Sequence, residues 1–302
     1  MYDTMSGHTP AMPGAAAASK GDSDMTILQA IFLGLVQGVT EFLPVSSSGH
    51  LSILQNFFGI TAEGDSGMVF DVLLHLGTLV SVVLAYREDL LHIWADCRGF
   101  VQNLGRPAPG EGQRHPGART VLMILIATLP LVLVLPVKDA IERLYYSTAF
   151  VGFMLVLTGA MLYVGDRMAR GRKGGAAMTV KDALFIGVCQ IAATIPGLSR
   201  SGTTITAGLS RGLQRSYAVK FSFLMSIPAV LGANLISLVK ALGSGVDLGL
   251  LPHCILGMLA AMGSGYLAIG LLRRLVQQGK FGHFAYYCVG LGLIVMLVSI
   301  FI

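Results

Sequence analysis

The sequence predicts an all-α polytopic membrane protein, with six transmembrane helices and two re-entrant helical hairpins arranged as an inverted-topology repeat. The first observation is composition: 54% of the 302 residues are hydrophobic and only 12% are charged, whereas soluble domains carry about 25% charged residues. The second is a series of long apolar stretches, two of which are interrupted by polar residues. The chain is too apolar for a soluble enzyme with a single anchor.

The ends and the cysteines add little to this picture. Residues 1–24 are rich in Gly, Ala, Ser and Pro and lack the apolar core of a signal peptide, so we expect a disordered tail before a single membrane domain at 25–302. The four cysteines are Cys97, Cys189, Cys254 and Cys288. They are far apart, without metal-binding spacing, and we interpret them as small apolar residues.

The first predicted hairpin begins at Met25. The apolar stretch Met25–Leu43 is broken by Pro44–His50 and followed by a second short apolar piece, Leu51–Ile60. Each piece is short for a membrane span, which needs about 20 residues. A broken backbone is tolerated at membrane depth only where protein buries it or where it lines a cavity. We therefore expect a re-entrant hairpin at a site.

The second predicted hairpin is Ala183–Leu209, and its break is Pro196–Thr204. This break carries Arg200 within mostly apolar flanks. A guanidinium at membrane depth is costly and by default marks a functional site. The alternative is an ordinary loop outside the membrane with an exposed arginine.

Six further apolar stretches are long enough to cross a membrane, and the charges between them predict orientation. The connections 86–119 and 165–182 carry five Lys or Arg residues each, so the positive-inside rule makes their face cytoplasmic. Six crossings then place both termini on the opposite, outer face. The predicted spans are Phe70–Tyr86, Thr120–Pro136, Thr148–Val164, Ala218–Val239, Leu251–Leu272 and Phe284–Ile302.

The two hairpins resemble each other when the chain is shifted by 153 positions. The matched pairs are Gly34 and Gly187, Gln37 and Gln190, Ser46 and Ser199, Ser48 and Ser201, and Gly49 and Gly202. We interpret them as parts of two repeats, at about 25–136 and 183–272. Hairpins that enter from opposite faces would meet near the membrane midplane and form a binding site there. Shared composition is the alternative explanation.

The first hairpin supplies candidates for acid–base chemistry. Glu41 lies one helical turn after Gln37 and can act as a metal ligand, as a general base or as the ion-pair partner of Arg200. The alternative without a function is a carboxylate at a solvated helix end. Ser46, Ser47 and Ser48 precede a helix, where hydroxyls and free N–H groups favour an anion, although one serine is explained as an N-cap. His50 can exchange protons near neutral pH or be structural.

The second hairpin supplies the positive charge and further donors. Arg200 can hold phosphate oxygens with two parallel hydrogen bonds. The hydroxyl donors around it are Ser199, Ser201, Thr203 and Thr204. A weaker pair, Asp71 and His75, shares a helix face in the first span and is interpreted as interfacial.

Two motifs resemble the signatures of one family. Gln37–His50, with the sequence QGVTEFLPVSSSGH, and Pro196–Thr204, with the sequence PGLSRSGTT, are similar to those of the bacterial undecaprenyl-pyrophosphate phosphatases of the bacitracin-resistance type. The resemblance covers Met25–Ile302. It implies hydrolysis of undecaprenyl pyrophosphate to undecaprenyl phosphate and inorganic phosphate, which recycles a lipid carrier for peptidoglycan and other envelope glycans. It also implies bacitracin resistance and a multi-pass inner-membrane enzyme open to the periplasm.

The resemblance also implies roles for residues. Glu41, Ser47, His50, Arg200 and Thr204 fall on functional positions of the family. We expect Ser47 as nucleophile with His50 as its base, or water activated directly by His50 or Glu41. A divalent cation, Mg²⁺ or Ca²⁺, would be held by Glu41 and Gln37, although the family often has Glu at the latter position, and an amide oxygen is the weaker ligand.

The expected partners are a polyprenyl pyrophosphate and membrane lipid, without nucleic acid, and a homodimer is the assembly to test. The alternative function is a lipid-phosphate flippase or a secondary transporter, because inverted repeats with polar residues at the membrane midplane are typical of transporter folds.

Overall fold

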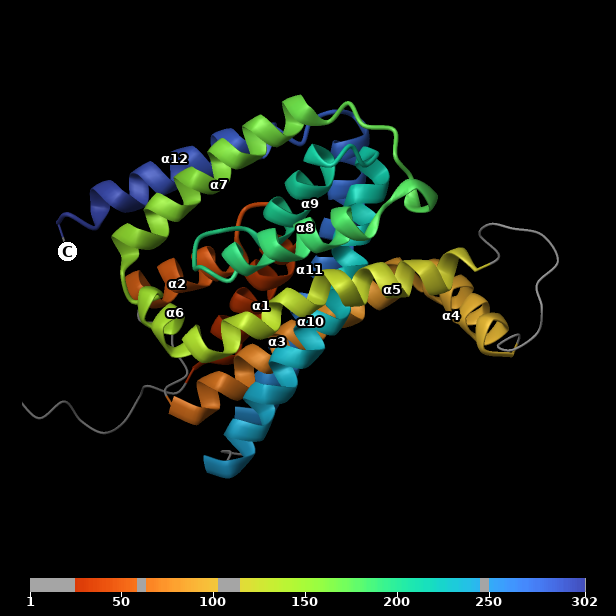
Figure 1. Ribbon diagram of the computed structural model, residues 1–302. Helices are drawn as coiled ribbons and strands as arrows, with labels where there is room; N and C mark the ends of the chain where they lie inside the picture. The colour runs from red at the N-terminus through yellow and green to blue at the C-terminus, as the bar shows by residue number, and fades with distance from the viewer. Residues whose placement is uncertain (1–24, 59–63, 103–114, 245–249, 302) are drawn as a thin grey trace, which may run out of the picture.

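The protein is a bundle of helices, described here by a computed structural model for residues 25–58, 64–102, 115–244 and 250–301 (Figure 1). Within these ranges β-structure is limited to one isolated bridge between Lys173 and Leu213. The predicted tail at 1–24 lies outside the described residues. The helices are α1 Ile27–Phe42, α2 Ser47–Phe58, α3 Gly64–Ala85, α4 Arg87–Gln102, α5 Pro116–Thr128, the 3₁₀ helix η1 Leu129–Val137, α6 Lys138–Leu144, α7 Thr148–Met168, the 3₁₀ helix η2 Gly175–Ala177, α8 Val180–Ala192, α9 Arg200–Ser210, α10 Arg215–Ser244, α11 Leu251–Gln277 and α12 His283–Val298.

Several helices are long and apolar enough to cross a membrane, which confirms an all-helical multi-pass membrane protein. The described residues contain four such helical segments, Pro116–Leu144, Thr148–Met168, Arg215–Val239 and Leu251–Gln277. A fifth is reached if α3 and α4, which meet at an angle of 76°, count as one broken span. The predicted last span coincides with α12, which is apolar but only 16 residues long.

Two segments differ from the sequence prediction. The predicted span 120–136 is not one α-helix, because α5 ends at Thr128 and continues as η1, in which Pro130 and Pro136 cannot donate backbone hydrogen bonds. The predicted polar connection 86–119 contains the helix α4, which packs on α5. Its first turn carries Glu88 and Asp89, which favour the positive end of a helix dipole.

The two broken segments are built alike. Both first helices start with a capping box: Thr26 caps α1 with Gln29, and Thr179 caps α8 with Asp182. The two caps are 153 positions apart, the same shift that relates the matched residues. Each capping box satisfies two backbone donors that a helix start leaves free.

The second helices start alike as well. Ser46 accepts a hydrogen bond from the backbone N–H of Gly49 at 3.1 Å, and Ser199 accepts one from that of Gly202 at 3.1 Å. These two N-cap contacts again differ by 153 positions.

The hairpins are also packed in the same way, through matched glycines. A Cβ on Gly34 of α1 would lie 2.2 Å from the carbonyl oxygen of Gly257 in α11, and one on Gly187 of α8 would lie 2.3 Å from that of Ala127 in α5. Each first helix therefore approaches a neighbour more closely than any other residue type allows. Helices α7 and α12 lie side by side along one edge of the bundle (Figure 1).

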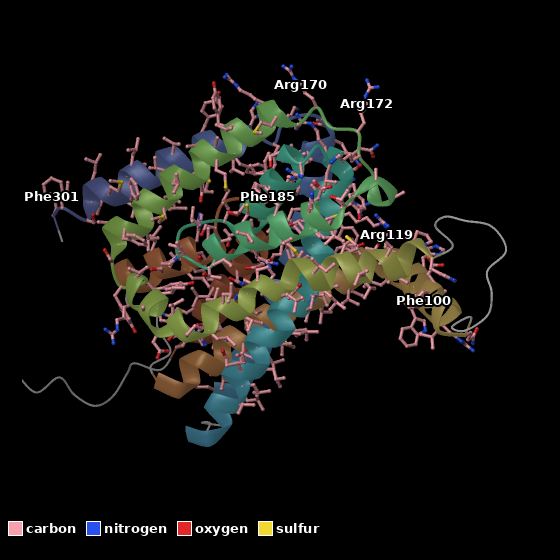
Figure 2. All side chains as sticks on the ribbon, viewed as in Figure 1. Phe100, Arg119, Arg170, Arg172, Phe185 and Phe301 are labelled. Atoms are coloured by element: carbon pink, nitrogen blue, oxygen red, sulfur yellow. The ribbon has the colours of Figure 1, made fainter. Side chains whose placement is uncertain are left out.

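The basic connection between α7 and α8 is tied to the bundle by Asp182, whose side chain is fully buried. Arg211 Nε lies 2.8 Å and Lys173 Nζ 3.4 Å from its carboxylate. Burial alone would raise the pKa of Asp182, but hydrogen bonds from the Thr179 backbone and from Arg211 outweigh it and hold the pKa at about 2. Other arginines of this connection, Arg170 and Arg172, point away from the helices (Figure 2).

Candidate functional site

The tips of the two hairpins meet through an ion pair. Arg200, the first residue of α9, places Nη2 2.5 Å from Oε1 of Glu41 near the end of α1. The two residues are 159 positions apart in the chain. The Glu41 side chain is 7% exposed and that of Arg200 is 21% exposed, so the arginine retains access to a ligand while it neutralises the buried carboxylate.

Glu41 gathers two further donors on its other oxygen. Ser47 Oγ donates to Oε2 at 2.6 Å, and Gln37 Nε2 donates to the same atom at 3.1 Å. The buried charge is thus compensated by one cation and two neutral donors, as a buried carboxylate requires. His75 of α3, interpreted from the sequence as interfacial, lies close enough to Glu41 to interact with it electrostatically.

The hydroxyl of Ser47 is held by Glu41 and not by His50. His50 Nδ1 lies 2.8 Å from the carbonyl oxygen of Ser46, and Nε2 lies 2.7 Å from the hydroxyl of Tyr287 in α12. Both ring nitrogens therefore have partners other than Ser47. The geometry favours Glu41 as the proton acceptor for Ser47, which differs from the Ser47–His50 pair expected from the sequence.

The backbone at Ser46 is strained. Its φ of 71° is the only positive value at a non-glycine residue in the described part of the chain. Such conformations cost roughly 1–3 kcal/mol and cluster at functional sites. The strained residue presents its carbonyl oxygen to both the backbone N–H and the ring of His50.

The remaining predicted ligands are four serines at the two turns and two threonines of α9. Ser46 and Ser199 are helix caps, and Oγ of each lies 3.2 Å from that of Ser48 or Ser201, respectively. These four hydroxyls stabilise the two turns, as the N-cap interpretation anticipated for one of them.

The two threonines of α9 differ from each other. Thr204 Oγ1 lies 2.6 Å from Ser222 Oγ and donates to the Arg200 carbonyl at 2.9 Å. Thr203 is 5% exposed, and its hydroxyl has no hydrogen-bond partner. Thr203 is therefore the predicted ligand with a free donor.

The described residues contain no ready-made cage for a divalent cation. No group of three His, Cys, Asp or Glu side chains among them could hold a metal ion. Gln37 Oε1 is buried without a hydrogen-bond partner and, with Glu41, would supply two oxygen ligands. Mg²⁺ is commonly bound by one or two protein oxygens together with substrate phosphates and water, so the pair fits a cation that arrives with its substrate.

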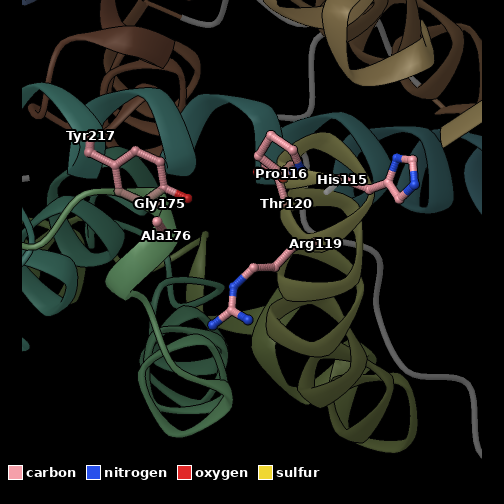
Figure 3. Close-up of a pocket in the computed structure, with 7 residues that line it drawn as sticks. All are labelled: His115, Pro116, Arg119, Thr120, Gly175, Ala176 and Tyr217. Carbon is pink, nitrogen blue, oxygen red and sulfur yellow. Dashed lines mark hydrogen bonds between the residues drawn. The ribbon is translucent and has the colours of Figure 1, made fainter. Parts of the chain in front are cut away.

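A cavity of about 420 Å³ lies at the opposite end of α8 from the hairpin tip (Figure 3). Its walls are the first residues of α5, the turn η2 and Tyr217 of α10. Arg119 lines this cavity and donates to the carbonyl of Met178 at 2.7 Å, which ties α5 to the residues before α8. The 13 residues of α8 span about 20 Å, so this cavity is separate from the Glu41–Arg200 cluster.

The fold and this cluster define a class: a multi-pass membrane protein whose polar site is assembled from two broken helices. The chain belongs to the family described as bacitracin resistance protein BacA, whose model matches residues 30–294. It is 43% identical over 282 residues to an undecaprenyl-diphosphatase from Methanobrevibacter smithii, covering 91% of this chain and 99% of that protein. It is 41% identical over 269 residues to one from Desulfosudis oleivorans, covering 89% and 97%.

Proposed function

We propose that this chain hydrolyses undecaprenyl pyrophosphate to undecaprenyl phosphate and inorganic phosphate, and so recycles the lipid carrier and confers bacitracin resistance. The family and the curated relatives support the reaction. The observation in the structure that carries the proposal is the Arg200–Glu41–Ser47 cluster, because it places a cation and a hydroxyl each within hydrogen-bond distance of one carboxylate, which can act as the base. Phosphoryl transfer needs positioning and compensation of charge more than any other contribution.

Arg200 binds the pyrophosphate. Its guanidinium offers five donors, of which the ion pair with Glu41 uses one at 2.5 Å. The others can hold phosphate oxygens in the fork geometry that lysine lacks. The Thr203 hydroxyl, which has no partner, is a second candidate donor to these oxygens.

Ser47 is the nucleophile in the mechanism that we favour. Its Oγ attacks the terminal phosphorus while its proton passes to Glu41, with which it already shares a hydrogen bond of 2.6 Å. The bond between phosphorus and the bridging oxygen breaks, and the lipid phosphate leaves with the proton from Glu41. Water then attacks the phosphoserine and loses a proton to Glu41, which returns it to Ser47 Oγ as inorganic phosphate is released.

Direct attack by water, activated by Glu41 or His50, is the competing mechanism. Ser47→Ala separates the two, because a variant that retains full turnover excludes a phosphoserine intermediate. Trapping phosphate on residue 47 by rapid quenching of the wild type would establish it. A control is Ser210→Ala, whose hydroxyl only donates to the Ala207 carbonyl at the end of α9.

The cation and the membrane arrangement belong to the same proposal. Glu41 and the free amide oxygen of Gln37 would be the protein ligands of a Mg²⁺ or Ca²⁺ ion that arrives with the pyrophosphate, and such an ion would neutralise phosphate charge, so we expect EDTA to lower phosphate release. Six crossings and two re-entrant hairpins form an inverted-topology repeat in the inner membrane, with both termini and the site opening on the periplasmic side. The matched caps and glycines support the repeat, and the basic connections support the orientation.

A lipid-phosphate flippase or transporter is the second candidate, favoured by the similar construction of the two hairpins. Purified protein in detergent distinguishes the two, because a transporter needs two compartments and a phosphatase does not. We expect phosphate release from undecaprenyl or farnesyl pyrophosphate in detergent. Wild-type protein that moves lipid between leaflets but releases no phosphate would overturn the proposed function.

A further inference from the structure

A contact between the first hairpin and the last helix extends the site beyond the two motifs. The Tyr287 hydroxyl lies 2.7 Å from His50 Nε2, across 237 positions of the chain. The two rings are also stacked, with centroids 5.7 Å apart and planes inclined by 5°. A hydrogen bond and a stacked ring together fix both the position and the rotation of an imidazole.

The partner of Nδ1 determines the tautomer of the neutral ring. A carbonyl oxygen can only accept, so Nδ1, at 2.8 Å from the Ser46 carbonyl, carries the proton. Nε2 is then the basic nitrogen, and it accepts from Tyr287. After protonation Nε2 would donate to the same hydroxyl, which can act as donor or acceptor. Tyr287 therefore serves both states of His50 without movement of the ring.

We infer that Tyr287 is a positioning residue for His50 in the reaction, an inference that rests on the proposed function and on the route in which His50 activates the attacking water. It holds the imidazole so that Nε2, and not Nδ1, is the nitrogen available to exchange a proton. Because the Tyr287 hydroxyl is the hydrogen-bond partner of Nε2, it is the group through which Nε2 exchanges a proton. The proton that His50 gains or loses can pass over this hydroxyl, which takes one proton on its oxygen as it releases its own.

The test is Tyr287→Phe, which removes the hydroxyl and keeps the stacked ring. We expect kcat for phosphate release to fall about tenfold, because one hydrogen bond to a functional group is lost, with KM changed less than twofold. Tyr286→Phe is the matched control: it removes a neighbouring hydroxyl on the same helix from a residue that is 70% exposed and whose ring lies edge-to-face with His283 instead. That control should retain wild-type kcat.

A second measurement separates positioning from general stabilisation. In a His50→Gln background, Tyr287→Phe should have no further effect on kcat, because a residue that acts through His50 loses its role with it. Equal losses in both backgrounds, or an unchanged kcat in Tyr287→Phe alone, would overturn the inference. Failure of the proposed function is recognised separately, since the wild type itself would then release no phosphate.

Discussion

The two hairpins share a frame and differ in chemistry. Thr26 and Thr179 cap their first helices, Ser46 and Ser199 cap their second helices, and matched glycines let α1 and α8 approach their neighbours. The candidate site residues occupy positions at which the two hairpins differ. After the shift of 153, Glu41 corresponds to Thr194, Ser47 to Arg200 and His50 to Thr203. The matched residues build the turns, and in the proposed mechanism the unmatched ones supply the reacting groups.

The matched glutamines, Gln37 and Gln190, show this difference between the two hairpins. Gln37 donates to Glu41, the carboxylate one turn later. Gln190 is 1% exposed, and neither its amide nitrogen nor its amide oxygen has a hydrogen-bond partner. One turn after it stands Thr194, whose hydroxyl donates to the Ile191 carbonyl. The second hairpin therefore has the matching amide, Gln190, but lacks a carboxylate one turn later that could accept a hydrogen bond from it.

The largest expected effect is on the cation of the second hairpin. Arg200→Ala should lower phosphate release about 10³-fold, because an arginine that compensates charge in phosphoryl transfer contributes on this scale. Arg172→Ala removes an arginine that points away from the helices (Figure 2) and should retain activity. Phosphate release by purified protein measures both. Equal phosphate release by the two variants would show that Arg200 is not part of the active site.

A matched pair of glutamine variants sharpens the comparison. Gln37→Leu should lower kcat about tenfold or more, since it removes a donor to Glu41. Gln190→Leu should leave activity within about twofold and should not lower the melting temperature, because it removes a buried amide that has no partner. Turnover and thermal unfolding in detergent check the pair. A large loss of activity in Gln190→Leu would contradict the division of roles.

A pair of glycine variants tests the shared frame. Gly34→Ala and Gly187→Ala should each destabilise the protein by roughly 1–3 kcal/mol, because each new Cβ would overlap a neighbouring carbonyl oxygen. Gly270→Ala in α11 is the control, since a Cβ there meets no atom within 4 Å. It should be neutral or stabilising by up to about 1 kcal/mol. Melting temperatures that do not separate the control from the pair would count against close packing.

A pH-dependent effect on stability concerns Asp182, a residue at the start of α8 without a charged counterpart in α1, where Gln29 occupies the matching position. Its pKa is about 2 when folded and about 3.9 when unfolded, so the ionised form stabilises the fold by on the order of 2 kcal/mol. This contribution is present above pH 4 and is lost as the pH falls toward 2. Asp182→Asn should therefore lower the melting temperature at pH 7, and the difference from wild type should shrink below pH 4.

Much of this arrangement follows from the sequence, because the hairpins are marked by Pro, Gly and Ser within apolar stretches. The ion pair between Glu41 and Arg200 was one of the roles predicted for Glu41, because a charge inside an apolar segment needs a partner. Tyr287 was missed because it lies in a uniformly apolar helix, far along the chain from His50. The Ser47–Glu41 contact was not foreseen either, because hydrogen-bond direction depends on side-chain rotamers that residue spacing leaves open.

The most direct test of the central claim is a double-mutant cycle on Glu41 and Arg200. Glu41→Gln and Arg200→Gln should each abolish most phosphate release, and the double variant should be little worse than either single one, because residues that act as a unit show non-additive losses. Independent losses that multiply in the double variant would show that the two hairpins do not form one site.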